Sequence, residues 1–165
     1  MDRYKSWSGL NRQLHDMLCD ELKGRVRYFL TRYHTVHDAY GRAAIRLDGR
    51  ELAVFSWVET YRQERDLAAR CATDRDRSYP ELATQLKPKW DADGTYSEMD
   101  FLDAALQFRR MPIRDALESE NCIIIILAIL DRRVGKRTLA NIRERGAYER
   151  EPDWVRQFYR LRLGE

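Results

Sequence analysis

The sequence predicts an α+β domain: an N-terminal helix, a three-stranded antiparallel β-meander, and then about five helices packed on the sheet. Leucines at helical spacing near the start, alternating apolar and polar residues around an Asp-Gly turn, and a later return of helical spacing predict this order. The 165 residues match the usual size of one domain, so residues 1–165 are expected to form a single domain.

The first element is predicted to be an amphipathic helix over Trp7–Lys23, with Ser6 or Ser8 as its N-cap and Gly24 as its left-handed stop. The apolar period then changes from 3.6 to 2, which predicts a half-buried strand over Arg25–Tyr33. Its inward face would carry Val26, Tyr28 and Leu30.

A β-hairpin is predicted at Asp48-Gly49, because a two-residue type I′ turn needs φ > 0 at both central positions. The expected pairs are Leu47 with Arg50, Arg46 with Glu51, Ile45 with Leu52 and Ala43 with Val54. This register would place Ala43, Ile45, Leu52 and Val54 on one apolar face.

Two capping-box patterns predict the next helices. Ser56 with Glu59 opens a helix over Trp57–Ala72, and Ser97 with Asp100 opens another that ends near Arg110. Between them, Pro80 would begin a short helix that Lys87-Pro88 closes, before a turn at 91–94. The inward residues of the first helix would be Val58, Tyr61, Ala68 and Cys71, and residues 113–117 would add one further turn.

The apolar run Cys122–Leu130 is buried by composition, but its periodicity does not separate a helix from a strand. Ser119 as a cap, an expected span of about 14 residues and Gly135 as a stop favour a central helix. Leu139 and Ile142 predict a short helix after Gly135, and Pro152 opens the last one.

The composition predicts an intracellular protein. The three cysteines are odd in number and far apart in sequence, which argues against a disulfide framework or a zinc site and favours a reducing cytoplasm. The polar N-terminus does not resemble a secretory signal, and a nine-residue apolar run is too short for a membrane span. His34, His37 and Asp38 form one cluster of metal-ligand type, but residues three apart on a strand face opposite ways, so we expect no metal site.

Basic residues concentrate at the two ends of the chain. Residues 1–50 carry 10 basic and 6 acidic side chains, residues 51–130 carry 10 and 15, and residues 131–165 carry 10 and 6. If the ends share a face, that face could meet an anion. The segment 132–138 lacks the glycine that a phosphate loop needs, since Leu130 stands at that position. The candidate anion- or nucleic-acid-binding residues are Arg25, Arg27, Arg132, Arg133, Lys136 and Arg137.

Three stretches together resemble a family of small uncharacterised bacterial proteins. They are Trp7-Ser8-Gly9-Leu10 with Leu22-Lys23-Gly24-Arg25-Val26, the hairpin from Gly41-Arg42 to Asp48-Gly49-Arg50, and the segment 130–139 with its Leu-Asp-Arg-Arg-Val-Gly-Lys-Arg core. The resemblance covers nearly the whole chain. It implies a bacterial cytoplasmic protein of one domain and carries no reaction, cofactor or catalytic residue.

Without a nucleophile motif, a dinucleotide fingerprint or a paired acid and base, no catalytic residue and no cofactor is predicted. The leading hypothesis is a non-enzymatic binding module for a protein or another acidic partner. The alternatives are a nucleic-acid binder that uses the basic residues above, and an enzyme with no motif visible in the sequence. A lone three-stranded sheet has edges to cover, so a homodimer through an edge strand or the last helix is a further hypothesis.

Overall fold

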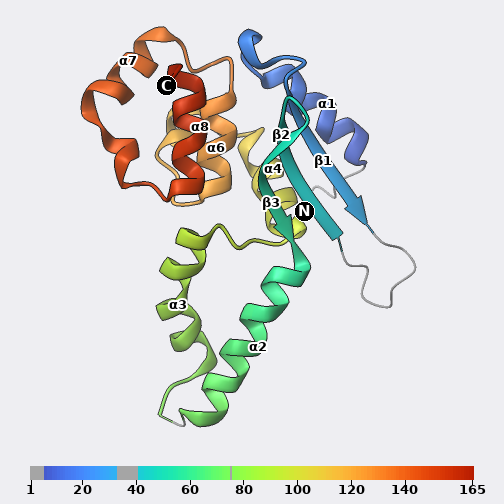
Figure 1. Ribbon diagram of the computed structural model, residues 1–165, viewed down its shortest axis with the longest axis vertical. Coiled ribbons are helices and arrows are strands. Elements are labelled where there is room, and N and C mark those ends of the chain that lie inside the picture. The colour runs from blue at the N-terminus through green and yellow to red at the C-terminus, as the bar shows by residue number, and fades with distance from the viewer. Residues whose placement is uncertain (1–5, 33–40, 75) are drawn as a thin grey trace.

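The computed structural model describes residues 6–32, 41–74 and 76–165 (Figure 1). Its order of elements confirms the predicted α+β class: a helix, three strands in antiparallel pairing, and then helices to the end. The elements are α1 (Trp7–Met17), the 3-10 turn η1 (Asp20–Leu22), β1 (Val26–Arg32), β2 (Gly41–Leu47), β3 (Arg50–Ser56), α2 (Trp57–Thr73), α3 (Tyr79–Asp93), α4 (Glu98–Phe108), α5 (Ile113–Leu117), α6 (Cys122–Leu130), α7 (Lys136–Arg145), the 3-10 turn η2 (Ala147–Arg150) and α8 (Asp153–Leu163).

The predicted hairpin turn is confirmed. Asp48 and Gly49 both have positive φ, 50° and 84°, as a type I′ turn requires. Leu47 pairs with Arg50, and Arg46 with Glu51, as the sequence predicts. The third strand, β1, pairs with β2, so the sheet order is β1-β2-β3.

The remaining hairpin pairs were predicted one residue out of register. A β-bulge at Ile45 gives β3 one extra residue, so Ile45 pairs with Ala53 and the strand beyond is shifted. Because side chains alternate along a strand, that shift exchanges the two faces. Phe55 is therefore fully buried, whereas Val54, predicted to face inward, is 38% exposed and Leu52 is half-buried. Burying the larger aromatic ring removes more apolar surface from water.

Helix α1 begins as predicted but ends sooner. The Ser6 hydroxyl accepts a hydrogen bond from a first-turn N–H, yet the helix stops at Met17 rather than at Lys23. Leu18 is extended and forms an isolated antiparallel bridge with Asp131.

Two backbone hydrogen bonds explain this early stop. The N–H of Cys19 donates to the carbonyl of Leu130 (2.9 Å), and the N–H of Arg132 donates to the carbonyl of Met17 (2.8 Å). Pairing with a distant segment thus replaces the helical hydrogen bonds that the leucine spacing predicts.

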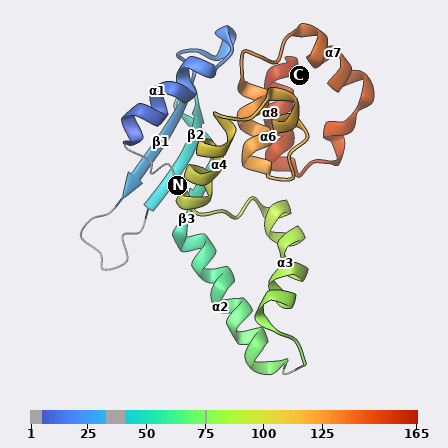
Figure 2. The same ribbon diagram turned by 180° about the vertical axis from the view of Figure 1, so that it is seen from behind.

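The hydrophobic core lies between the inward face of the sheet and two layers of helices. Helices α1 and α4 pack on the sheet, and α6 packs against α4 on the side away from the strands (Figures 1 and 2). The ring of Phe101 on α4 stacks on Phe55 at 5.3 Å and contacts Trp7 and Tyr28. All nine residues of α6 are buried, and α8 covers its other side.

Helices α2 and α3 project from the rest of the molecule as a helical hairpin, which we call the arm (Figure 1). Its buried side chains are Leu67 and Leu82, and neither belongs to the main core. The sequence places Val58, Tyr61 and Ala68 inward on α2, but all three are exposed. The prediction was wrong for these three because α2 packs mainly against α3, which covers one side of it; the fourth predicted residue, Cys71, is half-buried.

Helix α3 runs past the proline that was predicted to close it. Pro88 lies inside the helix, and Gly94 ends it in the left-handed conformation at φ 69°. Proline removes one backbone hydrogen bond, but the last turn is held from outside, since the indole N–H of Trp154 donates to the carbonyl of Asp91 (2.8 Å). A capping box between Ser78 and Glu81 opens the helix.

The apolar run 122–130 is a helix, as favoured, but its ends differ from the prediction. Asn121, not Ser119, is the N-cap, and its side chain accepts from the N–H of Ile123 (2.9 Å). The helix ends at Leu130, where the antiparallel bridge begins, so Gly135 does not stop it. Gly135 is extended and serves as the N-cap of α7.

None of the helices in the described ranges combines the length and the apolar character needed to cross a bilayer.

Candidate functional site

A cleft of about 970 Å³ opens between the two helices of the arm and the start of α4. We call it the arm cleft. Its size lies at the upper end of the range for ligand pockets in proteins, about 300–1,000 Å³. Its walls are formed by α2, α3, α4 and the segments that precede α4 and α6. Its lining includes Trp57, Glu64, Tyr79, Ala83, Lys87, Trp90, Asp91, Tyr96, Met99, Asp100, Asp103 and Glu120.

Apolar and aromatic side chains form one part of the lining. Trp57 begins α2, Trp90 lies near the end of α3, and Tyr96 follows α3. Tyr79 and Met99 are 50% and 46% exposed, although large apolar side chains usually bury more of their surface. The cleft therefore offers aromatic rings and a thioether to solvent.

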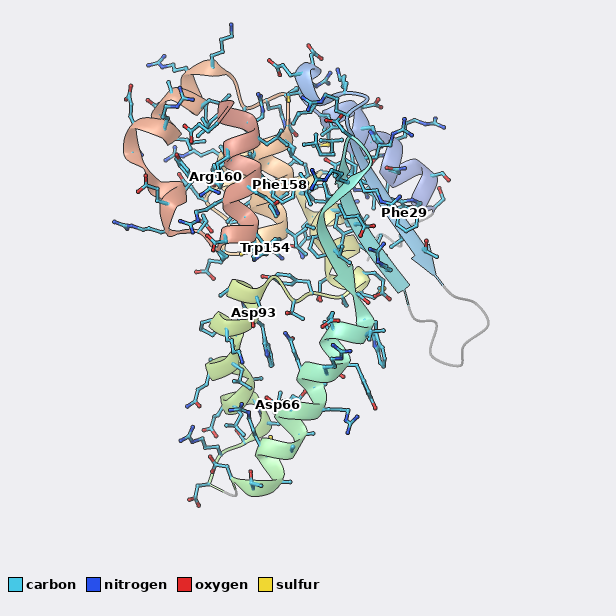
Figure 3. The ribbon with its side chains drawn as sticks, viewed as in Figure 1. Phe29, Asp66, Asp93, Trp154, Phe158 and Arg160 are labelled. Carbon is cyan, nitrogen blue, oxygen red and sulfur yellow. The ribbon has the colours of Figure 1, made fainter. Side chains whose placement is uncertain are left out.

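The base of the cleft is fixed by contacts between α8 and the end of α3. Figure 3 shows Trp154 at the lower end of α8, above the end of α3 where Asp93 is labelled. The Trp154 ring packs against Tyr96 with centroids 5.7 Å apart. A Cβ at Gly94 would lie 2.9 Å from the indole, so the indole needs a glycine there. These contacts hold α3 in place on the body of the protein, which comprises the sheet, α1 and α4–α8.

Carboxylates supply most of the charge in the cleft. Asp91 forms an ion pair with Lys87 and accepts a hydrogen bond from the Tyr96 hydroxyl (2.7 Å). Asp100 accepts from the backbone and hydroxyl of Ser97, which completes the capping box of α4.

Three further carboxylates remain. Across the described part of the chain, no hydrogen bond or ion pair engages Glu64, Asp103 or Glu120. They come from α2, from α4 and from the segment before α6. The cleft is therefore negatively charged on more than one wall.

Burial, together with the neighbouring Asp91 carboxylate, raises the pKa of the Tyr96 phenol well above its ordinary value of 10.0. The phenol consequently stays protonated at neutral pH and acts as a hydrogen-bond donor. Burial likewise raises the pKa of the Cys122 thiol. These shifts move both groups away from the ionised form that a nucleophile needs.

The six basic residues predicted from the sequence lie in two neighbouring regions rather than in one continuous patch. Arg25 and Arg27 flank the start of β1, and the other four surround the connection between α6 and α7. The bridge between Leu18 and Asp131 connects the stretch before β1 to the second region. The pKa of Asp20 in that stretch is lowered mainly by its hydrogen bond and ion pair with Lys23, and to a smaller extent by the charge of Arg132.

Two of the six are committed to structural contacts. Arg25 pairs with Asp48 at the hairpin turn (2.7 Å). Arg133 pairs with the fully buried side chain of Asp131 (2.9 Å), donates to the carbonyl of Met111, and lies over the ring of Phe108. Arg133 is thus engaged by a buried carboxylate, whereas the pair of Arg25 with Asp48 lies exposed at the surface.

Lys136 and Arg137 occupy the exposed first turn of α7, and Arg132 is exposed beside them. Arg27 lies on the outward face of the sheet, directly opposite Arg46. Like charges placed opposite each other on a sheet repel. Arg46 is offset by an ion pair with Glu51 and by a cation–π contact with Phe29 at 4.3 Å.

The connection between α6 and α7 is also organised by a residue that the sequence did not single out. Arg162 on α8 is 9% exposed and donates to the carbonyls of Ile129 (3.2 Å) and Val134 (2.9 Å). It also pairs with Glu21 (3.5 Å). The basic segment around Gly135 is therefore built on a buried guanidinium from the end of the chain.

The cluster of His34, His37 and Asp38 lies outside the described residues. Within the described ranges, no group of three or more histidine, cysteine, aspartate or glutamate side chains is placed to hold a metal ion.

One buried carboxylate lies apart from the cleft. Glu98, the first residue of α4, is 3% exposed, and its Oε2 has no hydrogen-bond partner. A Cβ at Gly41 would lie 2.6 Å from its Cγ, so Glu98 packs directly on the start of β2.

Sequence reasoning missed the arm cleft because its lining comes from four separate stretches of the chain. The carboxylates lie in four stretches that are distant in the sequence, and only the position of α3 beside α2 and α4 brings them to one cleft. The one usable signal was the excess of acidic residues between 51 and 130.

No curated protein and no solved structure is significantly similar to this chain. One family model does match, over residues 6–163, which is nearly the whole length. It includes the three stretches that carried the resemblance in the sequence. The chain therefore belongs to the SF0329 protein family.

Proposed function

We propose that this protein is a non-enzymatic interaction module that binds a segment of a partner protein in the arm cleft. The observation that carries the proposal is the cleft itself, which is large enough for several side chains and lies between a projecting helical hairpin and the body.

The distribution of exposed apolar residues supports the same proposal. Among the described residues, the exposed large apolar side chains are Val54, Val58, Tyr61, Tyr79 and Met99. Three belong to the arm, and two of the five, Tyr79 and Met99, line the cleft. Exposed apolar groups in a concavity are typical of interaction sites.

A cleft-filling variant tests this function. Ala83 is half-buried in the cleft lining on α3, so Ala83→Trp should occupy the cleft without entering the main core. A displayed library of random short peptides is selected on the wild-type protein. We expect the recovered peptides to lose affinity for Ala83→Trp by about tenfold or more, which corresponds to about 1.4 kcal/mol.

Ala140→Trp is the matched control, because Ala140 is exposed on α7 and outside the cleft. It should bind the peptides as the wild type does. Failure to recover any peptide, or equal binding by Ala83→Trp, would contradict the proposal.

An enzyme remains the weaker proposal. The cleft contains carboxylates and a tyrosine, but the raised pKa of Tyr96 makes that phenol a poor base at neutral pH. A catalytic role would require one of the three unengaged carboxylates to act alone.

Nucleic-acid binding is the second candidate, and the opposed Arg27 and Arg46 beside Phe29 favour it. Basic and aromatic side chains on an open sheet face are typical of single-strand binders. If a labelled single-stranded oligonucleotide binds there, its affinity should fall steeply with salt, and replacing Arg27 and Arg132 by glutamine should reduce that slope. Arg160→Gln, on exposed α8 surface, is the control. Weak binding with no salt dependence would remove this candidate.

Two further hypotheses concern the protein in its cell. The free thiols of Cys19, Cys71 and Cys122 support a reducing compartment such as a bacterial cytoplasm. β1 is an edge strand, and pairing through it with a second copy would give a homodimer. A single monomeric species in light scattering at high micromolar concentration would rule out the dimer.

A further inference from the structure

Resting on the proposed function, we infer that the partner segment is cationic and that it inserts arginine or lysine side chains into the arm cleft. The inference follows from the sign of the charge, the position of the unengaged carboxylates and the aromatic lining.

The charge of the lining is strongly one-sided. The cleft is lined by five carboxylates, and Lys87 is the one basic side chain among its described lining residues. Lys87 is already neutralised by Asp91. A cleft lined by charges of one sign concentrates its field in the opening and attracts ligands of opposite charge.

The carboxylates that are left lie on different walls. Glu64 reaches the cleft from α2, Asp103 from α4, and Glu120 from the segment before α6. Guanidinium or ammonium groups that enter between the arm and the body at different points would each find a carboxylate on a nearby wall. Each contact would be a charge-assisted hydrogen bond, which is stronger than one between neutral groups.

The aromatic side chains favour the same ligand. Four aromatic side chains line the cleft: Trp57, Tyr79, Trp90 and Tyr96. The negative face of an aromatic ring attracts a cation. Arginine combines a flat face for stacking with a fork of donors for carboxylates, so it should bind better than lysine. An acidic partner, by contrast, would meet repulsion in this cleft and would have to use the basic segments around Arg27 and Arg132.

The peptide selection described above tests this inference separately from the proposed function. We expect the peptides whose binding is blocked by Ala83→Trp to be enriched in arginine and lysine. Their affinity should fall as the NaCl concentration rises, because exposed charge pairs are screened by salt.

A neutralised cleft provides the direct comparison. The triple variant Glu64→Gln, Asp103→Asn and Glu120→Gln keeps the shapes of the side chains and should weaken binding of these peptides by about tenfold or more. The control variant Asp16→Asn, Asp115→Asn and Glu144→Gln removes three exposed carboxylates outside the cleft, and it should bind as the wild type does.

Two outcomes overturn the inference alone, and a third overturns the proposed function with it. Neutral or acidic peptides that occupy the cleft, or full binding by the neutralised cleft, would leave the proposed function standing and refute a cationic segment. A recovery of no peptides would refute both. Self-association that is abolished by Ala83→Trp and by Lys136→Gln with Arg137→Gln would support a cationic occupant and would identify it as a segment of a second copy of this chain.

Discussion

At the scale of single residues, several positions are determined by one neighbour that lies far away in the sequence. Gly41 faces the buried side chain of Glu98, Gly94 faces the ring of Trp154, and His15 packs its ring against Tyr28 with centroids 5.4 Å apart. The effect of a substitution at such a position on stability can be predicted, because the neighbouring side chain that the new group would contact is known.

Gly41→Ala should destabilise the protein by about 1–3 kcal/mol, the usual cost of overpacking a buried site. The added Cβ would lie 2.6 Å from Cγ of Glu98. Urea denaturation of Gly41→Ala, Glu98→Ala and the double variant measures the coupling. We expect the double variant to be more stable than Gly41→Ala alone, and purely additive losses would show that the two side chains do not meet.

His15 should make stability depend on pH. Burial and the nearby charge of Arg27 lower its pKa below 6.5, while Asp16 acts in the opposite direction. The unfolded chain then binds the proton more readily, so the contribution of His15 is present above pH 6.5 and is lost as the pH falls toward its folded pKa.

The free energy of unfolding of wild type and His15→Gln, measured by urea denaturation at pH 5 and pH 7.5, checks this sign. The excess of the wild type's free energy of unfolding over that of His15→Gln should be smaller at pH 5 than at pH 7.5. A larger excess at pH 5 would contradict a lowered pKa of His15. Groups that titrate equally in both proteins cancel in the difference.

At the scale of elements, local sequence predicted where most helices and strands begin. The predicted boundaries were wrong where a segment distant in the sequence contacts the end of the helix. Met17 ends α1 because the chain pairs with Asp131, and Pro88 lies within α3 because Trp154 supports the following turn. The bulge at Ile45 is likewise invisible in the pattern, since Leu52 and Val54 alternate as well as Ala53 and Phe55 do.

The candidate site was less accessible to prediction than the fold. The basic residues were found because they cluster in the sequence, yet Arg25 is paired with Asp48 and Arg133 with the buried Asp131. Three of the cleft carboxylates lie far apart in the sequence, at Glu64, Asp103 and Glu120. They line one cleft only because the arm packs beside α4.

Trp154→Phe should loosen the arm more than the body. It removes the hydrogen bond to the carbonyl of Asp91, worth about 0.5–1.5 kcal/mol. Because the indole also packs against Phe55 in the core, amide hydrogen exchange should accelerate most in α3 and less in α6. Tyr148→Phe, which removes the hydroxyl contact with Glu165, is a control outside the arm. Equal acceleration in α3 and α6 would show instead that the arm and the core open together.

At the scale of the whole molecule, the first and last parts of the chain are joined around α6. Backbone hydrogen bonds connect residues 17–19 with 130–132. Arg162 on α8 contacts both sides of this connection, since it donates to the carbonyl of Ile129 and pairs with Glu21. The sheet, α6 and α8 therefore depend on one another for stability. The arm has separate apolar contacts, because its buried Leu67 and Leu82 do not belong to the main core.

Arg162→Met should be strongly destabilising, by about 2–4 kcal/mol, because it leaves the carbonyls of Ile129 and Val134 without their donor. Arg160→Met is the matched control on the same helix, where the side chain is exposed (Figure 3). Urea denaturation of both variants should show a lowered midpoint for Arg162→Met alone. Equal midpoints would mean that water replaces the guanidinium at no cost.

The bridge between Leu18 and Asp131 also constrains how the protein can form during synthesis. Ribosomes add roughly 5–20 residues per second, so the partner of Leu18 is made on the order of ten seconds after Leu18 itself. By the end of that interval the nascent chain contains the hairpin and the arm, but it still lacks the isoleucine-rich helix that fills the core. Packing of the core must therefore wait until α6 has been synthesised.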